Sequence, residues 1–164
     1  MNLIGNTVLE LLTDPARYQA LREDPTGVAP LVEEMLRYNG PVNTVTLRYT
    51  AAPVPLGESV IPAGELVLVS VASANRDERQ FTAPATFDPD RGAHGHLAFG
   101  HGIHYCLGAG LARLEARVAL TRLVRRYPLL RPAVDHADLR WRESILIRGL
   151  HELPVVAVSA PAVR

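Results

Sequence analysis

A glycine-rich loop over residues 99–110 holds the only cysteine of this 164-residue chain. The loop leads directly into the most regular helical pattern of the sequence, so Cys106 is expected at a helix N-terminus. Glycine allows close backbone approach and dihedral angles that other residues avoid. Free amide groups and the positive end of a helix dipole favour a thiolate over a thiol. We therefore expect Cys106 to act as a nucleophile or as a metal ligand.

Other interpretations of this loop fit less well. A dinucleotide-binding fingerprint needs a third glycine where Tyr105 stands, and a phosphate-binding loop needs a Lys-Ser/Thr pair that does not follow. A lone cysteine is often a small buried hydrophobic residue, but the density of glycines argues against that role here. A zinc site is a minor alternative because a second clustered ligand pair is missing. That site would use His96, His101, His104 and Cys106.

Composition limits the partners that we expect. Lys and Arg number 17 and Asp and Glu also number 17, so the zero net charge disfavours a nucleic-acid binder. A single cysteine excludes an internal disulfide and suits a reducing compartment. No apolar run reaches the length of a membrane span, and the N-terminus lacks an export signal. We therefore expect a cytoplasmic protein with no membrane partner and no nucleic-acid partner.

Hydrophobic periodicity and turn residues predict a mainly α protein with small β-sheets, in the α+β class. The helix over 107–126 should place Leu107, Leu111, Leu114, Val118 and residues 120–124 on one side. Within the β region, residues 66–71 are expected to form a strand buried on both faces. The segments, taken as one partial domain, are helices over 1–12, 15–22 and 28–38, a β region over 42–72, a meander over 73–98, the cysteine loop over 99–108, a helix over 107–126 and strands within 134–158.

The cysteine loop resembles the haem-binding signature of the cytochrome P450 superfamily, in its soluble bacterial branch. The resemblance implies that Cys106 is the axial ligand of the iron in haem b. It also implies that Phe99 packs beside the porphyrin and that His104 reaches a haem propionate. The matching positions are Phe99, Gly100, Gly102, His104, Cys106, Leu107 and Gly108, followed by Ala112 and Arg113.

Two further segments fit the same family. Glu34 and Arg37 are spaced so that both side chains lie on one helix face, which usually gives a surface ion pair of little stability. The resemblance implies instead that this pair is buried, that Arg91 joins it, and that the three residues hold the meander. Arg48 matches a position from which relatives hold a propionate, and a solvated charge at a strand edge is its alternative.

The resemblance implies a monooxygenase that uses O₂ and two electrons from NAD(P)H, delivered through a ferredoxin and its reductase. An apolar small molecule is the expected substrate. The residues that would line its pocket are Val42, Asn43, Thr44, Val45, Ile145 and Leu146.

Family members are much longer than this chain, which would begin just after the acidic residue and threonine that deliver protons to oxygen. We therefore expect a C-terminal fragment without catalytic residues of its own, with the missing N-terminal part of the enzyme as a partner. The capless start of the helix over 1–12 agrees with this expectation. The alternative is a non-catalytic haem-binding remnant or an interaction fragment.

Overall fold

The computed structural model describes residues 2–158. In that range the chain forms five α-helices and four short 3₁₀ turns. The α-helices are α1 (Asn2–Thr13), α2 (Pro15–Glu23), α3 (Val28–Asn39), α4 (Val71–Ala74) and α5 (Ala109–Arg126). The turns are η1 (Pro25–Gly27), η2 (Pro89–Arg91), η3 (Gly102–His104) and η4 (His136–Asp138).

Local sequence signals explain where α2 begins and ends. Asp14 accepts a hydrogen bond from the Arg17 amide, and Pro15 occupies the first helical position, where no amide is needed. Asp24 ends α2 and caps η1 by accepting from the Thr26 amide. The helix boundaries in this part therefore follow from residues within three positions of each end.

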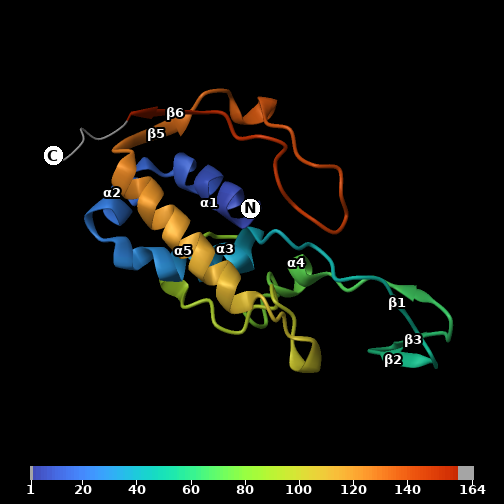
Figure 1. Ribbon diagram of the computed structural model, residues 1–164. Coiled ribbons are helices and arrows are strands. Elements are labelled where there is room, and N and C mark those ends of the chain that lie inside the picture. Colours follow the sequence, from blue (N-terminus) through green and yellow to red (C-terminus); the bar gives the residue numbers. More distant parts are fainter. Residues whose placement is uncertain (1, 159–164) are drawn as a thin grey trace.

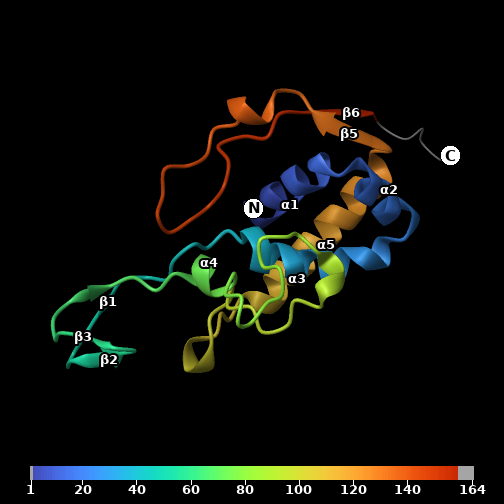
Figure 2. The same ribbon diagram turned by 180° about the vertical axis from the view of Figure 1, so that it is seen from behind.

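The strands form three separate antiparallel pairs, which confirms the expected class of helices with small sheets. β1 (Arg48–Tyr49) pairs with β4 (Leu66–Val67), and β2 (Val54–Leu56) pairs with β3 (Ser59–Ile61). These four strands belong to residues 46–69, here called the β arm, which extends away from the helices (Figures 1 and 2). The third pair joins β5 (Leu129–Pro132) to β6 (Val155–Val158) above α1 in Figure 1.

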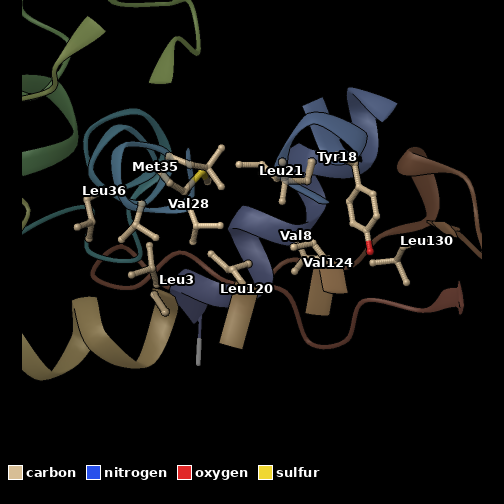
Figure 3. Close-up of a cluster of buried hydrophobic side chains, with 14 residues drawn as sticks. Leu3, Val8, Tyr18, Leu21, Val28, Met35, Leu36, Leu120, Val124 and Leu130 are labelled. Carbon is tan, nitrogen blue, oxygen red and sulfur yellow. The ribbon is translucent and has the colours of Figure 1, made fainter. Parts of the chain in front are cut away.

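The hydrophobic core lies among α1, α2, α3 and α5 (Figure 3). The almost completely buried residues there include Leu11 of α1, Val32 and Met35 of α3, and Leu120 of α5. Tyr18 reaches past this core, and its hydroxyl donates to the Tyr127 carbonyl over 2.7 Å. That bond connects α2 to the end of α5, so the core fixes the helix that follows the cysteine loop.

The expected strand over residues 66–71 is wrong in length and in burial. β4 covers only two residues, and Leu66, Leu68 and Val69 are exposed. Val71 is buried, but it begins α4. An apolar run predicts burial only where another layer covers it, and here β4 has a single two-residue partner.

The expected apolar side of the helix over 107–126 also differs from the structure. The helix begins at Ala109, and its buried residues are Ala109, Ala116, Leu120 and Val124. The helix therefore has two apolar faces, and the described residues cover one of them. The uncovered face carries Leu111, Leu114 and Val118, and Leu107 lies exposed just before the helix.

The segment over 134–158 has fewer strand residues than expected. Only β6 lies within it, and the partner strand β5 precedes it. Near the expected strands the chain makes isolated bridges, between Trp141 and Leu150 and between Val42 and Ile147. The segment forms single bridges there rather than longer strand pairs, because it crosses the surface instead of entering a sheet (Figure 1).

Candidate functional site around Cys106

Cys106 lies at the end of a tight loop that precedes α5. Its amide donates to the Phe99 carbonyl over 2.9 Å, and its carbonyl accepts from the Ala109 amide over 3.2 Å. Gly100 and Gly102 have φ values of +78° and +69°, a region in which a side chain would be strained. These bonds hold the backbone on both sides of Cys106, while the residue itself stays exposed as a free cysteine.

The sulfur lies close to the start of α5. A Cβ atom placed on Gly108 would lie 3.8 Å from the Cys106 Sγ, which is an ordinary van der Waals distance. Gly108 is also the N-cap of the helix and supplies no side-chain hydrogen bond to its first turn. Uncapped amides and the dipole of an 18-residue helix both favour negative charge at this end. This environment suits a thiolate ligand.

The surroundings of Cys106 fit a haem. A single thiolate is the ligand that haem takes in cytochromes P450, and the exposed thiol can be reached from outside the chain. Ile103 and Leu107 flank it with fully exposed apolar side chains, and Phe99 packs partly buried against the core. An apolar rim with one charged ligand suits a flat hydrophobic group with a metal at its centre.

Glu34, Arg37 and Arg91 form one connected group. Arg37 donates to both carboxylate oxygens of Glu34 over 2.7 Å, and neither side chain is exposed to solvent. The Arg91 Nε donates to Glu34 Oε1 over 3.2 Å, and the Asp88 amide donates to the same oxygen over 2.9 Å. Glu34 and Arg37 therefore do not form the surface ion pair that residues at this spacing usually form.

Both arginines also hold the meander by its backbone. Arg37 donates to the carbonyls of Asn75, Pro84 and Thr86, and Arg91 donates to the carbonyls of Thr82, Ala83 and Thr86. A guanidinium suits this role because its five donors lie in one plane with fixed directions. The network ties residues 75–91 to α3.

Glu33, His96 and Arg113 form a second group that the sequence did not single out as a site. Arg113 donates to Glu33 through Nε over 2.6 Å and through Nη2 over 2.9 Å. The His96 Nε2 lies 3.1 Å from Glu33 Oε2. The sequence pointed to Arg113 only as a position that matches the family signature and to His96 only as a zinc ligand, and Glu33 is a second carboxylate directly before Glu34.

In this second group, Glu33 and Arg113 each stabilise the charged form of the other. Burial by itself raises the pKa of Glu33, but the hydrogen bonds from His96 and Arg113 outweigh it and lower that pKa to about 2. The hydrogen bond to Glu33 raises the pKa of Arg113 above its ordinary value, against the opposing effect of burial. Both residues therefore stay charged at neutral pH and hold each other in place.

The residues expected at the haem propionates lie on different elements. His104 is exposed in η3, two positions before Cys106. Arg48 is exposed in β1 on the β arm, where its Nη1 donates to the Thr46 hydroxyl over 3.4 Å. No hydrogen bond joins His104 to Arg48 within the described residues, so each would have to meet the cofactor separately.

The two segments expected to line a substrate pocket lie side by side. The Asn43 amide donates to the Leu146 carbonyl over 2.8 Å, and the Thr44 hydroxyl donates to the Ile145 carbonyl over 3.2 Å. Val42 and Val45 are half-buried next to them. The structure thus gathers these six residues from two parts of the chain about 100 positions apart.

The zinc alternative finds no support in the structure. Between residues 2 and 158, no three His, Cys, Asp or Glu side chains gather closely enough to hold a metal ion. His96 is instead engaged by Glu33, while His101 and His104 are exposed. In the same part of the chain, every helix is too short or too polar to serve as a membrane span.

Known proteins resemble this chain throughout its length. A cytochrome P450 of Saccharopolyspora erythraea, named 107B1, is 54% identical over 94% of the chain. The vitamin D(3) 25-hydroxylase of Pseudonocardia autotrophica is 49% identical over the same share. The solved structure of the tirandamycin C-bound P450 monooxygenase TamI is 49% identical, with a TM-score of 0.90 over 94% of the chain.

The chain spans only 38% of the length of these two curated relatives and 39% of the TamI chain. The family model described as cytochrome P450 matches residues 28–148, a range that includes both arginine networks and the whole cysteine loop. Together with the exposed Cys106 thiol at the start of α5, this match shows that the chain belongs to the cytochrome P450 family, whose cofactor is haem b.

Proposed function

We propose that this chain is the haem-ligating part of a haem-thiolate monooxygenase that oxidises an apolar organic molecule. The observation that carries the proposal is the exposed thiol of Cys106, held by backbone hydrogen bonds at the uncapped start of α5. In this proposal the Cys106 Sγ binds the iron, and Gly100 and Gly108 let the backbone approach the porphyrin. Phe99 packs beside the sulfur in this arrangement. His104 and Arg48 bind the haem propionates.

When bound, the haem supplies the oxygen chemistry, since thiolate ligation pushes electron density to the iron and favours O–O cleavage. The protein's part is to hold Cys106 in place. Glu34, Arg37 and Arg91 hold the meander that leads to the loop. One oxygen atom enters the substrate and the other leaves as water, with two electrons from NAD(P)H passing through a ferredoxin and its reductase. A cytoplasmic location suits these partners.

An apolar small molecule is the substrate class that the described residues favour. Val42, Val45, Ile145 and Leu146 offer apolar side chains, and Asn43 and Thr44 add small polar groups between them. Pockets of this composition bind hydrophobic ligands and orient them through few polar contacts. Two relatives agree with this class, because one is named a vitamin D(3) 25-hydroxylase and the other holds tirandamycin C.

A spectroscopic experiment tests the proposal. Haemin is added to the purified protein, which is then reduced and exposed to carbon monoxide. The expected result is the red-shifted Soret band of a thiolate-bound haem, and Cys106→Ala abolishes it. His101→Ala is the matched control, since His101 is exposed in the same loop. A normal haem spectrum without that band, or its persistence in Cys106→Ala, contradicts the proposal.

Substrate oxidation with hydrogen peroxide as the oxygen source separates the proposal from its alternative. An active enzyme oxidises an apolar test substrate only when haem and Cys106 are both present. Thiolate-bound haem without any turnover would instead identify a non-catalytic haem-binding protein.

A further inference from the structure

The second charged group, Glu33, His96 and Arg113, contacts two residues of the Cys106 loop. The Arg113 guanidinium lies over the Phe99 ring, 4.6 Å from its centroid. Its Nη1 also donates to the Tyr105 hydroxyl over 3.1 Å. Phe99 begins the loop and Tyr105 precedes the cysteine, so one side chain of α5 holds both ends of the segment.

Phe99 connects this group to the cysteine directly. Its carbonyl accepts the Cys106 amide over 2.9 Å, while its ring lies between Arg113 and two other rings. The His96 ring is 6.2 Å away and the Tyr105 ring is 6.4 Å away, the latter in an edge-on arrangement. The contacts to the Phe99 ring therefore hold the same residue whose carbonyl accepts from the Cys106 amide.

The orientation of His96 is fixed by two contacts. The Ala98 amide donates to the His96 Nδ1 over 3.2 Å, so the ring proton of neutral His96 lies on Nε2. That nitrogen points at Glu33 Oε2, and the histidine side chain is only 4% exposed. His96, near the end of the meander, and Arg113, on α5, thus bind the same carboxylate, and Glu33 anchors both to α3.

We propose that Arg113 is a positioning residue for the thiolate centre, held in place by Glu33 and His96. It fixes Phe99, and through the Phe99 carbonyl it fixes the backbone of Cys106. The proposal rests on the proposed haem-thiolate function, because it concerns how the chain tunes its iron ligand. It goes beyond that function by assigning a joint role to Glu33, His96 and Arg113, none of which is an iron or propionate ligand in the proposed function.

The charges of Arg113 and Glu33 predict the direction in which each variant shifts the reduction potential of the iron. Reduction of the iron adds one negative charge to the site, which a nearby positive charge favours and a nearby negative charge opposes. Arg113 and Glu33 together are close to neutral. Loss of the arginine charge leaves Glu33 unbalanced, and loss of the Glu33 charge leaves Arg113 unbalanced. The two variants should therefore shift the reduction potential in opposite directions, whereas simple loosening of the loop would act alike in both.

The experiment measures two properties in each variant. Spectroelectrochemistry of the haem-loaded protein gives the midpoint potential, and hydrogen exchange of the haem-free protein reports the Cys106 amide. We expect Arg113→Gln to lower the potential and Glu33→Gln to raise it. Arg113→Lys keeps the charge but not the two-pronged grip, so it restores the potential while the amide exchanges about tenfold faster. Arg117→Gln and Glu115→Gln, at exposed positions on α5, are controls that should change neither property.

The outcomes separate this proposal from the proposed function. If the unaltered protein shows no thiolate-type spectrum, the proposed function fails first. If it does, shifts of the same sign in Arg113→Gln and Glu33→Gln, or none, overturn the effect assigned to the Arg113 charge and leave the function standing. Unchanged exchange of the Cys106 amide in Arg113→Lys also overturns the positioning role.

Discussion

Among single residues, Glu34 combines complete burial with an ion pair to Arg37. Its carboxylate accepts from Arg37, Arg91 and the Asp88 amide, so the cost of removing it from water is offset by charge-assisted hydrogen bonds. Glu34→Ala leaves the Arg37 guanidinium buried without its counter-charge. We expect this variant to lower the free energy of unfolding by about 3–5 kcal/mol, measured by urea denaturation.

A matched control separates burial from mere pairing. Asp77 and Arg79 also form a two-pronged pair, but that pair is exposed on the meander. Asp77→Ala should leave the urea midpoint close to that of the unaltered protein, because exposed pairs contribute little. Equal effects of Glu34→Ala and Asp77→Ala would show that burial of the Glu34 network is not what stabilises the meander.

Protonation of Glu33 makes the free energy of unfolding depend on pH. Its folded-state pKa of about 2 lies below the usual value of 4.5, although burial alone would raise it, because Arg113 and His96 stabilise the charged form. The stabilisation is fully present above pH 4.5 and is lost as the pH falls from there toward 2. After discounting for solvent screening at a side chain that is 30% exposed, we expect a contribution of about 1 kcal/mol.

Urea denaturation of the haem-free protein at pH 6 and at pH 3 measures this contribution. The loss of stability between the two pH values should be smaller in Glu33→Gln by about 1 kcal/mol, since the variant has no proton to gain there. Glu115→Gln, an exposed carboxylate on α5, should behave like the unaltered protein. An identical pH dependence in Glu33→Gln would contradict the assignment.

The sequence predicted residues whose signal is local. Cys106 stood out through its glycines and the helix after it, and Glu34 and Arg37 through their spacing. The pairing of Glu33 with Arg113 could not be predicted in this way, because the partners are 80 positions apart. Neither residue type is rare, and although Arg113 matches the family signature, nothing in the sequence links it to Glu33. Only the folded chain brings them together.

For whole elements, the same limit applies: local sequence predicts where a helix lies but not which of its faces is buried. The positions of α2 and α3 follow from Pro15, Asp14 and the periodic apolar residues, all of which act within a turn or two. Which apolar face of α5 is buried depends on the helices packed beside it, and these lie far away in sequence. Leu114 and Leu120 are equally apolar, yet the packed helices cover only Leu120.

This contrast within α5 is testable. Leu120 is 0% exposed and contacts the core, whereas Leu114 is 56% exposed on the other apolar face. Leu120→Ala should lower the free energy of unfolding by about 2–5 kcal/mol, because it removes buried contacts and leaves a cavity. Leu114→Ala should change it by less than about 0.5 kcal/mol. Thermal and urea denaturation of both variants check this, and a larger effect at Leu114 would mean that its face is covered in solution.

At the scale of the whole molecule, the helices of the described chain are well packed and the β arm is not. Four helices share one core and support the cysteine loop, so the proposed iron ligand Cys106 follows directly on the best-packed part of the described chain. The β arm, residues 46–69, contains no buried residue and extends away from that core (Figure 2). Isolated two-stranded pairs are marginally stable in water. The proposed propionate ligands are divided between these parts, with His104 near the core and Arg48 on the β arm.

The β arm should therefore open independently of the helices. Hydrogen exchange followed by mass spectrometry of the haem-free protein should show its amides exchanging more than about a hundredfold faster than those in the middle of α3 and α5, because few buried contacts oppose local opening. Leu36→Ala, in the buried core, should speed exchange in the helices and leave the β arm unchanged. Leu56→Ala, on the exposed β2, should alter neither. Equal protection of the β arm and α3 would show that the two parts unfold together, and Arg48 would then be fixed before any cofactor arrives.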